Sequence, residues 1–383
     1  MGILKIGIPF IREKDNMVQM VSNITENDKN YEIWYEVEKE YGEYLTTERI
    51  DSFFVALLPL AMKDRLNVVS DGVISEKLYF HTIKYLIPLL SKYSKNYGHI
   101  EINIKNKSNQ SINTQGKSAT GFSRGVDSFD TVKEMSDCGS YSLTHLAFFN
   151  VGSHKSTSGY SPEEATALYK KRLSISKESS KIINLPVVAV NSNLGEHLIY
   201  EYLKVHHYCS FSAVLALQKL FKNYYYSSAY ELAEFSIEKC DKGPAFYEAL
   251  FASLMSTEST SIYISGLDKT RLEKVNSISE YAPSYDHLNV CFNNEYNCGV
   301  CEKCMRTQLE LYSLGKLELY KNSFDLDVFY KNKDKCIDYM LKHQNQNVYK
   351  EIIQQFEKSG ISLSFSQKFK KLLYAIAIKI LRK

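Results

Sequence analysis

The sequence predicts an α/β protein with a doubly wound parallel sheet, an N-terminal α+β domain and a helical C-terminal tail. Three observations carry this prediction. Apolar segments at residues 143–151, 185–190 and 261–265 have the length and composition of buried strands, and helical segments separate them. Hydrophobic residues make up 44% of the 383 residues and charged residues 24%, as is usual for a folded globular protein. Aromatic residues make up 13%, which excludes a mostly disordered chain.

The first 115 residues are expected to form an N-terminal α+β accessory domain. Strand-like and helical segments alternate in it, at residues 30–45 (strand), 50–62 (helix, interrupted by Pro59), 66–74 (strand), 78–93 (helix) and 99–104 (strand). A polar run at residues 105–116 has the composition of a linker, so the boundary to the next domain is placed there.

Residues 116–320 are expected to form the second domain, in which strands and helices alternate as in a parallel sheet. The expected elements are strand 118–122, a helix from Asp127, strand 143–151, a helix opened by Ser161 and Pro162, strand 185–190, helix 210–221, a strand at Tyr224–Tyr226, strand 261–265 and a helix from Asp268. Ligands of such sheets bind beyond the carboxyl ends of the strands. Residues 321–383 read as a helical C-terminal region.

Charge and composition exclude several classes of protein. The 47 Lys and Arg against 44 Asp and Glu leave a formal net charge of +3, too balanced for a protein that holds nucleic acid mainly through phosphates. The sequence holds no run of about 18 apolar residues, the length that a membrane span needs. The first residues lack a signal-peptide pattern. We therefore expect a cytoplasmic protein that does not bind nucleic acid, and we also expect a homodimer.

The segment from Gly121 to Ser128, GFSRGVDS, is the most specific motif of the chain. It follows a strand and opens a helix, where free N–H groups and the helix dipole attract anions. Gly125 lets the backbone approach a phosphate, Ser123 adds a hydroxyl donor as Ser128 does, and Asp127 offers a hard oxygen ligand for Mg²⁺. We expect the Asp127 carboxylate to have no packing role. The alternative is an ordinary turn capped by Ser123.

Four cysteines within fourteen residues predict a metal site, because the pairs are spaced as metal ligands: Cys291, Cys298, Cys301 and Cys304. Gly299 supplies the backbone angle that such a tight turn needs. Four sulfurs with no open position indicate a closed, structural zinc site; an iron–sulfur cluster is the competing interpretation, and unligated thiols are the third. The remaining cysteines are interpreted as core residues: Cys138, Cys209, Cys240 and Cys336.

Both motifs resemble parts of one enzyme superfamily. Ser123–Ser128 resembles the S-G-G-x-D-S signature of the PP-loop ATP pyrophosphatases, with Arg124 where the signature has its first glycine. The segment NCGVCEKCMRT resembles the zinc knuckle of the 7-cyano-7-deazaguanine synthases, including Arg306, and follows the loop by about 170 residues, as in those enzymes. The resemblance covers Ser118 to roughly Lys316 and implies an adenine nucleotide alpha-hydrolase-like sheet.

The resemblance implies ATP as cosubstrate, with Mg²⁺ and a structural Zn²⁺. The loop would hold the pyrophosphate through Ser123, Arg124, Gly125, Val126, Asp127 and Ser128. Arg124 either crowds this loop or adds a charge for the pyrophosphate. Catalytic roles are assigned to Asp127, Ser128 and Arg306. A fourth is assigned to Arg271, which could clamp a carboxylate or phosphate, although a solvated surface position is the favoured interpretation of that residue. Polar residues at the ends of two strands are candidates for the adenosine: Asn150, Gly152, Asn191 and Asn193.

The leading hypothesis is an AMP-forming enzyme that adenylates a small acid for attack by a nitrogen nucleophile. A non-catalytic nucleotide sensor and a tRNA sulfur-transfer enzyme are the alternatives. Residues 368–383 hold six basic residues and no acidic one, and Phe369, Leu372 and Ile376 recur at helical spacing. This pattern suggests contact with a membrane surface or a partner groove, but the favoured interpretation is a terminal helix docked on the core.

Overall fold

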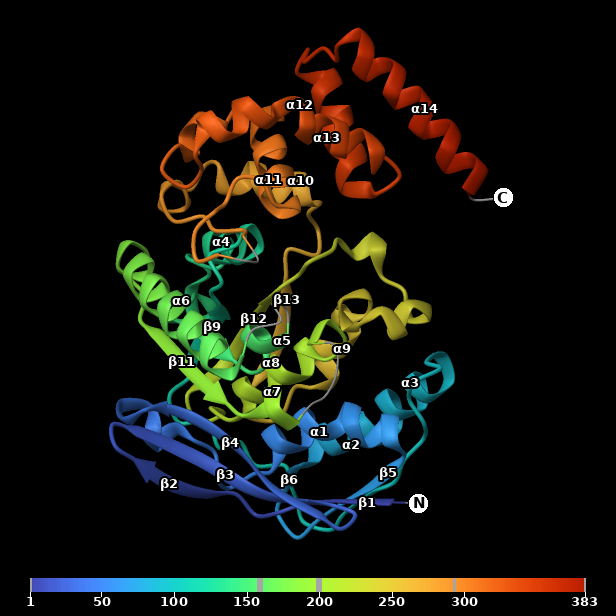
Figure 1. Cartoon of the computed structure of the whole chain (residues 1–383). Coiled ribbons are helices and arrows are strands. Elements are labelled where there is room, and N and C mark those ends of the chain that lie inside the picture. Colours follow the sequence, from blue (N-terminus) through green and yellow to red (C-terminus); the bar gives the residue numbers. More distant parts are fainter. Residues whose placement is uncertain (1, 157–160, 198–201, 292–293, 382–383) are drawn as a thin grey trace. The chain divides into compact units, whose positions relative to one another are not determined.

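The computed structural model describes residues 2–156, 161–197, 202–291 and 294–381 (Figure 1). The chain forms two compact units. The first comprises Met1–Phe122 and Glu134–Leu267, and the second comprises Ser123–Lys133 and Asp268–Lys383. The class of the fold is α/β, with a mostly parallel central sheet and a helical C-terminal region, as the alternation of apolar strands and helices predicted.

An 11-stranded sheet dominates the first unit. Along it the strands follow the order β13-β12-β9-β10-β11-β4-β3-β1-β5-β7, and β2 pairs with β3. Their bounds are β1 (Gly2–Ile6), β2 (Phe10–Lys14), β3 (Met17–Glu26), β4 (Lys29–Glu38), β5 (Leu66–Ser70), β7 (Ile102–Ile104), β9 (Lys117–Gly121), β10 (His145–Asn150), β11 (Val187–Ser192), β12 (Phe221–Ser227) and β13 (Ser261–Ser265).

The five strands from β13 to β11 are all parallel, as their sequence pattern predicted. β9 lies between β10 and β12, so the chain builds the sheet outward from β9, first to one side and then to the other. Ligands of open parallel sheets bind beyond the carboxyl ends of the strands at such a reversal. β9 ends at Gly121, and the glycine- and serine-containing loop follows directly.

The N-terminal strands extend the same sheet. β4 pairs antiparallel with β11, through Asn191 opposite Glu36 and Ser192 opposite Tyr35. The sheet is therefore continuous across the boundary that the sequence suggested between residues 115 and 116. The polar run at 105–116 is also not a free linker, because it contains β8 (Lys107–Ser108), which pairs with β6 (Ile74–Ser75).

Helices of the first unit pack on this sheet. They are α1 (Asp51–Asp64), α2 (Glu76–His81), α3 (Ile87–Tyr93), α5 (Ser153–Ser156), α6 (Pro162–Ile183), α7 (Leu194–His197), α8 (His206–Leu215) and α9 (Glu248–Leu254). α1 continues through Pro59, where an interruption was expected; every residue from Asp51 to Met62 is buried, and this packing offsets the lost hydrogen bond. α6 begins with the expected cap, in which Ser161 and Glu164 form a reciprocal capping box.

Two other helices differ from the sequence prediction. The expected helix at 210–221 begins earlier, at His206, and ends at Leu215, because Phe221 already belongs to β12. The expected helix at 78–93 is divided by a π-helical turn at Thr82–Leu86.

The second unit is helical. It holds α4 (Val126–Glu134), α10 (Arg271–Ile278), α11 (Glu302–Ser313), α12 (Leu326–Lys342), α13 (Asn347–Lys358) and α14 (Phe365–Leu381). The apolar faces of α11, α12 and α13 form its core, around Leu309, Phe329, Met340, Tyr349 and Phe356. Among the described residues, no helix combines the length and the apolar character that crossing a bilayer requires.

One buried carboxylate in the first unit ties α1 to its neighbours. Asp51 accepts hydrogen bonds from the Ser75 N–H at 2.8 Å and from Gln218 Nε2 at 2.9 Å. Burial disfavours the charged form and raises the pKa of Asp51 to about 6, although these hydrogen bonds and Arg49 act in the opposite direction. The native state therefore keeps this proton at pH values where the unfolded chain has lost it.

We predict that this group makes the protein less stable as the pH rises from about 4 to about 6. Asp51→Asn should remove the effect, so wild type should lose roughly 2 kcal/mol more than the variant in free energy of unfolding between pH 4.5 and 7. Urea unfolding at both pH values measures it. Asp64→Asn, on the exposed end of the same helix, is the control. Parallel pH profiles for wild type and Asp51→Asn would contradict the prediction.

Candidate functional site

The loop before α4 leaves the first backbone donors of the helix outside its hydrogen-bond pattern. The first intrahelical hydrogen bond runs from the Phe129 N–H to the Gly125 carbonyl at 3.0 Å, so the N–H groups from Val126 to Ser128 precede the helical hydrogen-bond pattern. Ser128 Oγ donates to the Gly125 carbonyl at 3.0 Å, and the Gly125 N–H donates to Ser123 Oγ at 3.3 Å. Ser123 thus caps the turn, as the alternative interpretation of this loop expected.

Arg124 has a backbone conformation that favours glycine. Its φ is +62°, in the left-handed region, which explains why the signature that this loop resembles has glycine at the position. The side chain is 4% exposed, and Nη2 donates to the Glu295 carbonyl at 3.1 Å. The Arg124 carbonyl accepts from the Asn289 N–H at 2.8 Å. Arg124 therefore connects the loop to the segment that carries the cysteines.

Asp127 belongs to an ion-pair network, so the expectation that it has no packing role is wrong. Arg271 Nη1 lies 3.1 and 3.2 Å from the two carboxylate oxygens of Asp127, and Lys274 Nζ lies 3.9 Å from one of them. The Asp127 side chain keeps 33% of its surface exposed. Cations from the first turn of α10 thus fix the carboxylate at the first turn of α4.

The network continues onto α11 through Arg271. Its Nε donates to Glu310 at 3.4 Å and its Nη2 to Thr307 Oγ1 at 3.3 Å. Arg306 Nε lies 3.9 Å from the other oxygen of Glu310. Burial raises the pKa of Glu310, and the two guanidinium groups oppose this shift. Burial also disfavours the charge on Arg271, but Asp127 and Glu310 outweigh it and raise the pKa of Arg271.

Several cations and carboxylates of α4, α10 and α11 meet in this network. Arg271, Lys274, Lys303 and Arg306 face Asp127, Glu310 and the half-exposed Glu302. Burial, together with the charges of Arg271 and Arg306, lowers the pKa of Lys303 to about 8. Partly desolvated positive charges beside a helix N-terminus favour binding of an anion.

The candidate adenosine residues lie in the first unit. Asn150 Nδ2 donates to Asn191 Oδ1 at 2.8 Å, so the structure brings the ends of β10 and β11 together as expected. Asn193 accepts from the Trp34 N–H at 3.0 Å and thereby holds β4. Gly152 has a φ of +107°, which a side chain would strain. The hydrogen bond to Trp34 indicates a structural role for Asn193. For all four residues, a role in adenosine binding stays a prediction.

The four cysteines converge on one point. Their sulfur atoms all lie within 4.8 Å of one another, and the pairs Cys291–Cys301 and Cys298–Cys304 are 4.0 Å apart. With a zinc–sulfur bond of about 2.3 Å, tetrahedral geometry separates the sulfurs by about 3.8 Å. The sulfurs are thus placed to hold a metal ion, and the geometry is consistent with zinc.

The cysteine segment is held in shape by side-chain amides. Asn289 Oδ1 accepts from the Cys291 N–H at 3.1 Å, and Asn297 Oδ1 accepts from the Val290 N–H at 2.8 Å. Gln308 Nε2 donates to the carbonyl of Gly299, whose φ of +74° confirms the expected turn conformation. The Cys301 N–H points at Cys298 Sγ at 3.3 Å; although burial disfavours the thiolate, such backbone donors lower the pKa of Cys298 to about 7.

The chain was compared with protein-family models, with curated proteins and with solved structures, and none of them matches it. The four-cysteine cluster is the part of the resemblance that the geometry bears out. The remaining evidence on function therefore comes from the arrangement of side chains in the second unit.

Several members of the site were missed from the sequence. Lys274 follows Arg271 by three residues, and Glu310 follows Arg306 by four, so each pair shares a helix face. These spacings were the available signal. Lys303 lies between Cys301 and Cys304. A cysteine metal-binding motif gives no function to the residues between its ligands, so the motif did not single out Lys303. Nothing in the sequence indicated that Arg124 reaches the cysteine segment.

We predict close to one zinc ion per chain by elemental analysis, with no visible absorption. Cys301→Ser should lose the metal and unfold at lower denaturant concentration, because zinc binding offsets the cost of ordering the segment. Cys138→Ser, at a half-buried thiol outside the cluster, is the matched control. A brown, iron-containing protein prepared without oxygen would refute zinc, and an ordered segment without any metal would refute the site.

The conformation of Arg124 gives a second prediction. Arg124→Ala and Arg124→Gly both remove the hydrogen bond to Glu295, but only glycine adopts a positive φ without cost. The alanine variant should therefore be less stable than the glycine variant by about 1 kcal/mol. Urea unfolding of the two variants measures this difference directly. Equal stability would show that residue 124 does not have a left-handed backbone.

Proposed function

We propose that the chain is an ATP-dependent, AMP-forming enzyme of the PP-loop type with a doubly wound sheet. One observation carries the proposal. Two segments about 170 residues apart in the sequence, each resembling a motif of the same enzymes, lie in one network: Arg124 binds the Glu295 carbonyl, and Asp127 binds Arg271, which also binds Glu310 of α11. α11 carries Cys304 as well as Arg306.

The strand order supports the same proposal. The loop leaves the carboxyl end of β9, the strand at which the order of the parallel strands reverses. Phosphate groups of nucleotides bind in other open sheets at a helix N-terminus that follows such a strand. The N–H groups of Val126 to Ser128 would donate to the phosphate oxygens, and the cations of α10 and α11 would offset their charge.

In the proposed reaction a carboxylate oxygen of a small acid attacks the α-phosphorus of ATP. The bond from that phosphorus to the bridging oxygen of the β-phosphate breaks, and pyrophosphate leaves with the electron pair. A nitrogen nucleophile then attacks the acyl carbon and releases AMP. Asp127 would hold Mg²⁺, which when bound neutralises charge on the phosphates. The cations Lys303 and Arg306 would suit the leaving pyrophosphate or the acid.

The metal is proposed to be a zinc ion with a structural role. Four thiolates leave no open coordination position for a substrate. The ion would fix Cys301, which precedes α11, and Cys304 in its first turn, so it would set the orientation of Lys303 and Arg306. In a four-iron cluster each thiolate binds a different iron atom, which separates the sulfurs more widely than one ion does.

Sulfur transfer is the less favoured alternative, because it needs a reactive thiolate. Burial raises the pKa of Cys209 to about 12 and that of Cys336 to about 11, and it also raises the pKa of Cys240. A nucleotide sensor is favoured by one observation: Arg271 and Lys274 already occupy the Asp127 carboxylate. Turnover distinguishes the sensor from the enzyme.

The test is Mg²⁺-dependent formation of AMP and pyrophosphate from ATP with a pool of small carboxylic acids. Asp127→Asn keeps a hydrogen-bond acceptor for Arg271 but weakens metal binding, so AMP formation should fall roughly a hundredfold or more. The matched control is Asp137→Asn, an exposed carboxylate after the same helix. Unchanged AMP release from Asp127→Asn would refute the assignment, and binding of an ATP analogue by wild type without turnover would favour the sensor.

A further inference from the structure

α14 docks on the second unit through its polar side. Lys370 forms an ion pair with Asp338 of α12, and Gln367 Nε2 donates to Asp334 of the same helix at 3.1 Å. Lys371 pairs with Glu357 of α13 at 3.2 Å. A surface helix of a globular protein normally buries its apolar face instead.

The opposite side of α14 is apolar and exposed. Its side chains recur at helical spacing and each keeps about half or more of its surface open to solvent, from 48% for Leu373 to 89% for Phe365: Phe365, Phe369, Leu372, Leu373 and Ile376. Contiguous apolar surface of this kind marks an interaction site. The sequence predicted the amphipathic helix, and the structure shows that its charged side makes the intramolecular contacts.

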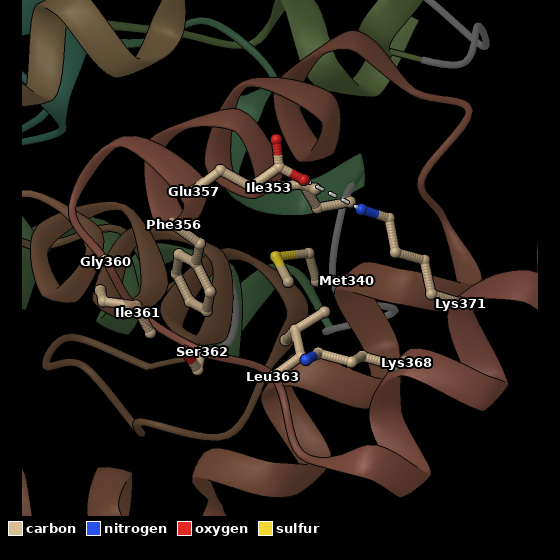
Figure 2. A pocket seen from close by; sticks show the side chains of 10 residues that line it. All are labelled: Met340, Ile353, Phe356, Glu357, Gly360, Ile361, Ser362, Leu363, Lys368 and Lys371. Carbon is tan, nitrogen blue, oxygen red and sulfur yellow. Dashed lines mark hydrogen bonds and ion pairs between the residues drawn. The ribbon is translucent and has the colours of Figure 1, made fainter.

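Lysines border this apolar face. Lys368 and Lys371, one helical turn apart, also line a half-open hollow of about 350 Å³ whose other walls are mainly apolar, including Met340, Phe356 and Leu363 (Figure 2). Figure 2 shows Lys371 directed to Glu357 at the edge of the hollow. Residues 368–383 contain six basic residues and no acidic one. Lys370 and Lys371 are paired with acidic residues of α12 and α13, and Lys368 is exposed.

We propose that the exposed face of α14 binds the surface of a membrane that contains anionic lipids. The apolar side chains would enter the boundary between headgroups and acyl chains, with the helix in the membrane plane, while the lysines meet lipid phosphates. Anionic lipid fits better than a second copy of this chain. Two such faces packed together would bring two segments rich in lysine, including the exposed Lys368 of each copy, into proximity.

Co-sedimentation of the full-length protein with vesicles tests the proposal. We expect binding to vesicles of phosphatidylcholine with about 30% phosphatidylglycerol, weaker binding to pure phosphatidylcholine, and loss of binding at high salt. The double variant Leu372→Gln/Ile376→Gln should bind at least about tenfold more weakly. Lys368→Gln should lower the affinity about fivefold. Leu319→Gln, at a similarly exposed leucine outside α14, should bind as wild type does.

Three outcomes would overturn the proposal. The first is the absence of vesicle binding by wild type. The second is binding that the Leu372→Gln/Ile376→Gln variant retains in full. The third is a concentration-dependent dimer, detected by light scattering, that this double variant abolishes, since the face would then join two copies of the chain. The substituted residues are exposed, so an unchanged unfolding transition and metal content show that the variant is folded.

Discussion

The second unit depends on one interaction, in which the guanidinium of Arg271 binds the carboxylates of both Asp127 and Glu310. Asp127, Arg271 and Glu310 come from three helices, and each has little or only partial access to water. Charges in such surroundings are tolerated only when they are paired and hydrogen-bonded, and losing one partner typically costs about 3–5 kcal/mol. The network therefore sets the positions of α4, α10 and α11 relative to one another, and with them the start of α4.

The cysteine segment further constrains the arrangement of α4 and α11. Its backbone is held by amide side chains of Asn289 and Asn297 and by Arg124 rather than by regular secondary structure. Such a segment gains little from apolar burial, so an ion bound by four sulfurs would supply much of its order. Because Asn289 also donates its N–H to the Arg124 carbonyl, order in the cysteine segment is linked to the conformation of the loop before α4.

Local patterns were predictable from the sequence, and contacts between distant segments were not. The apolar run of β10, the helix start at Ser161 and the positive φ of Gly299 follow from short-range physical chemistry, and the structure confirms them. The ion pair of Asp127 with Arg271 joins two residues that are 144 positions apart in the sequence. A single sequence holds no signal for such a contact. The sequence of α14 likewise predicted an apolar face and a basic face. It did not predict that acidic residues on α12 and α13 bind the basic face.

The junction of β4 with β11 has a consequence for how the protein can be divided. In the described part of the sheet, a short stretch of paired backbone joins the N-terminal strands to the parallel strands, and Asn193 adds a hydrogen bond to β4. A chain shortened to either side of it would present an open strand edge with unpaired N–H and carbonyl groups, the kind of surface that recruits other chains into aggregates. Fragments of this protein are therefore poor substitutes for the whole, however separate their sequences look.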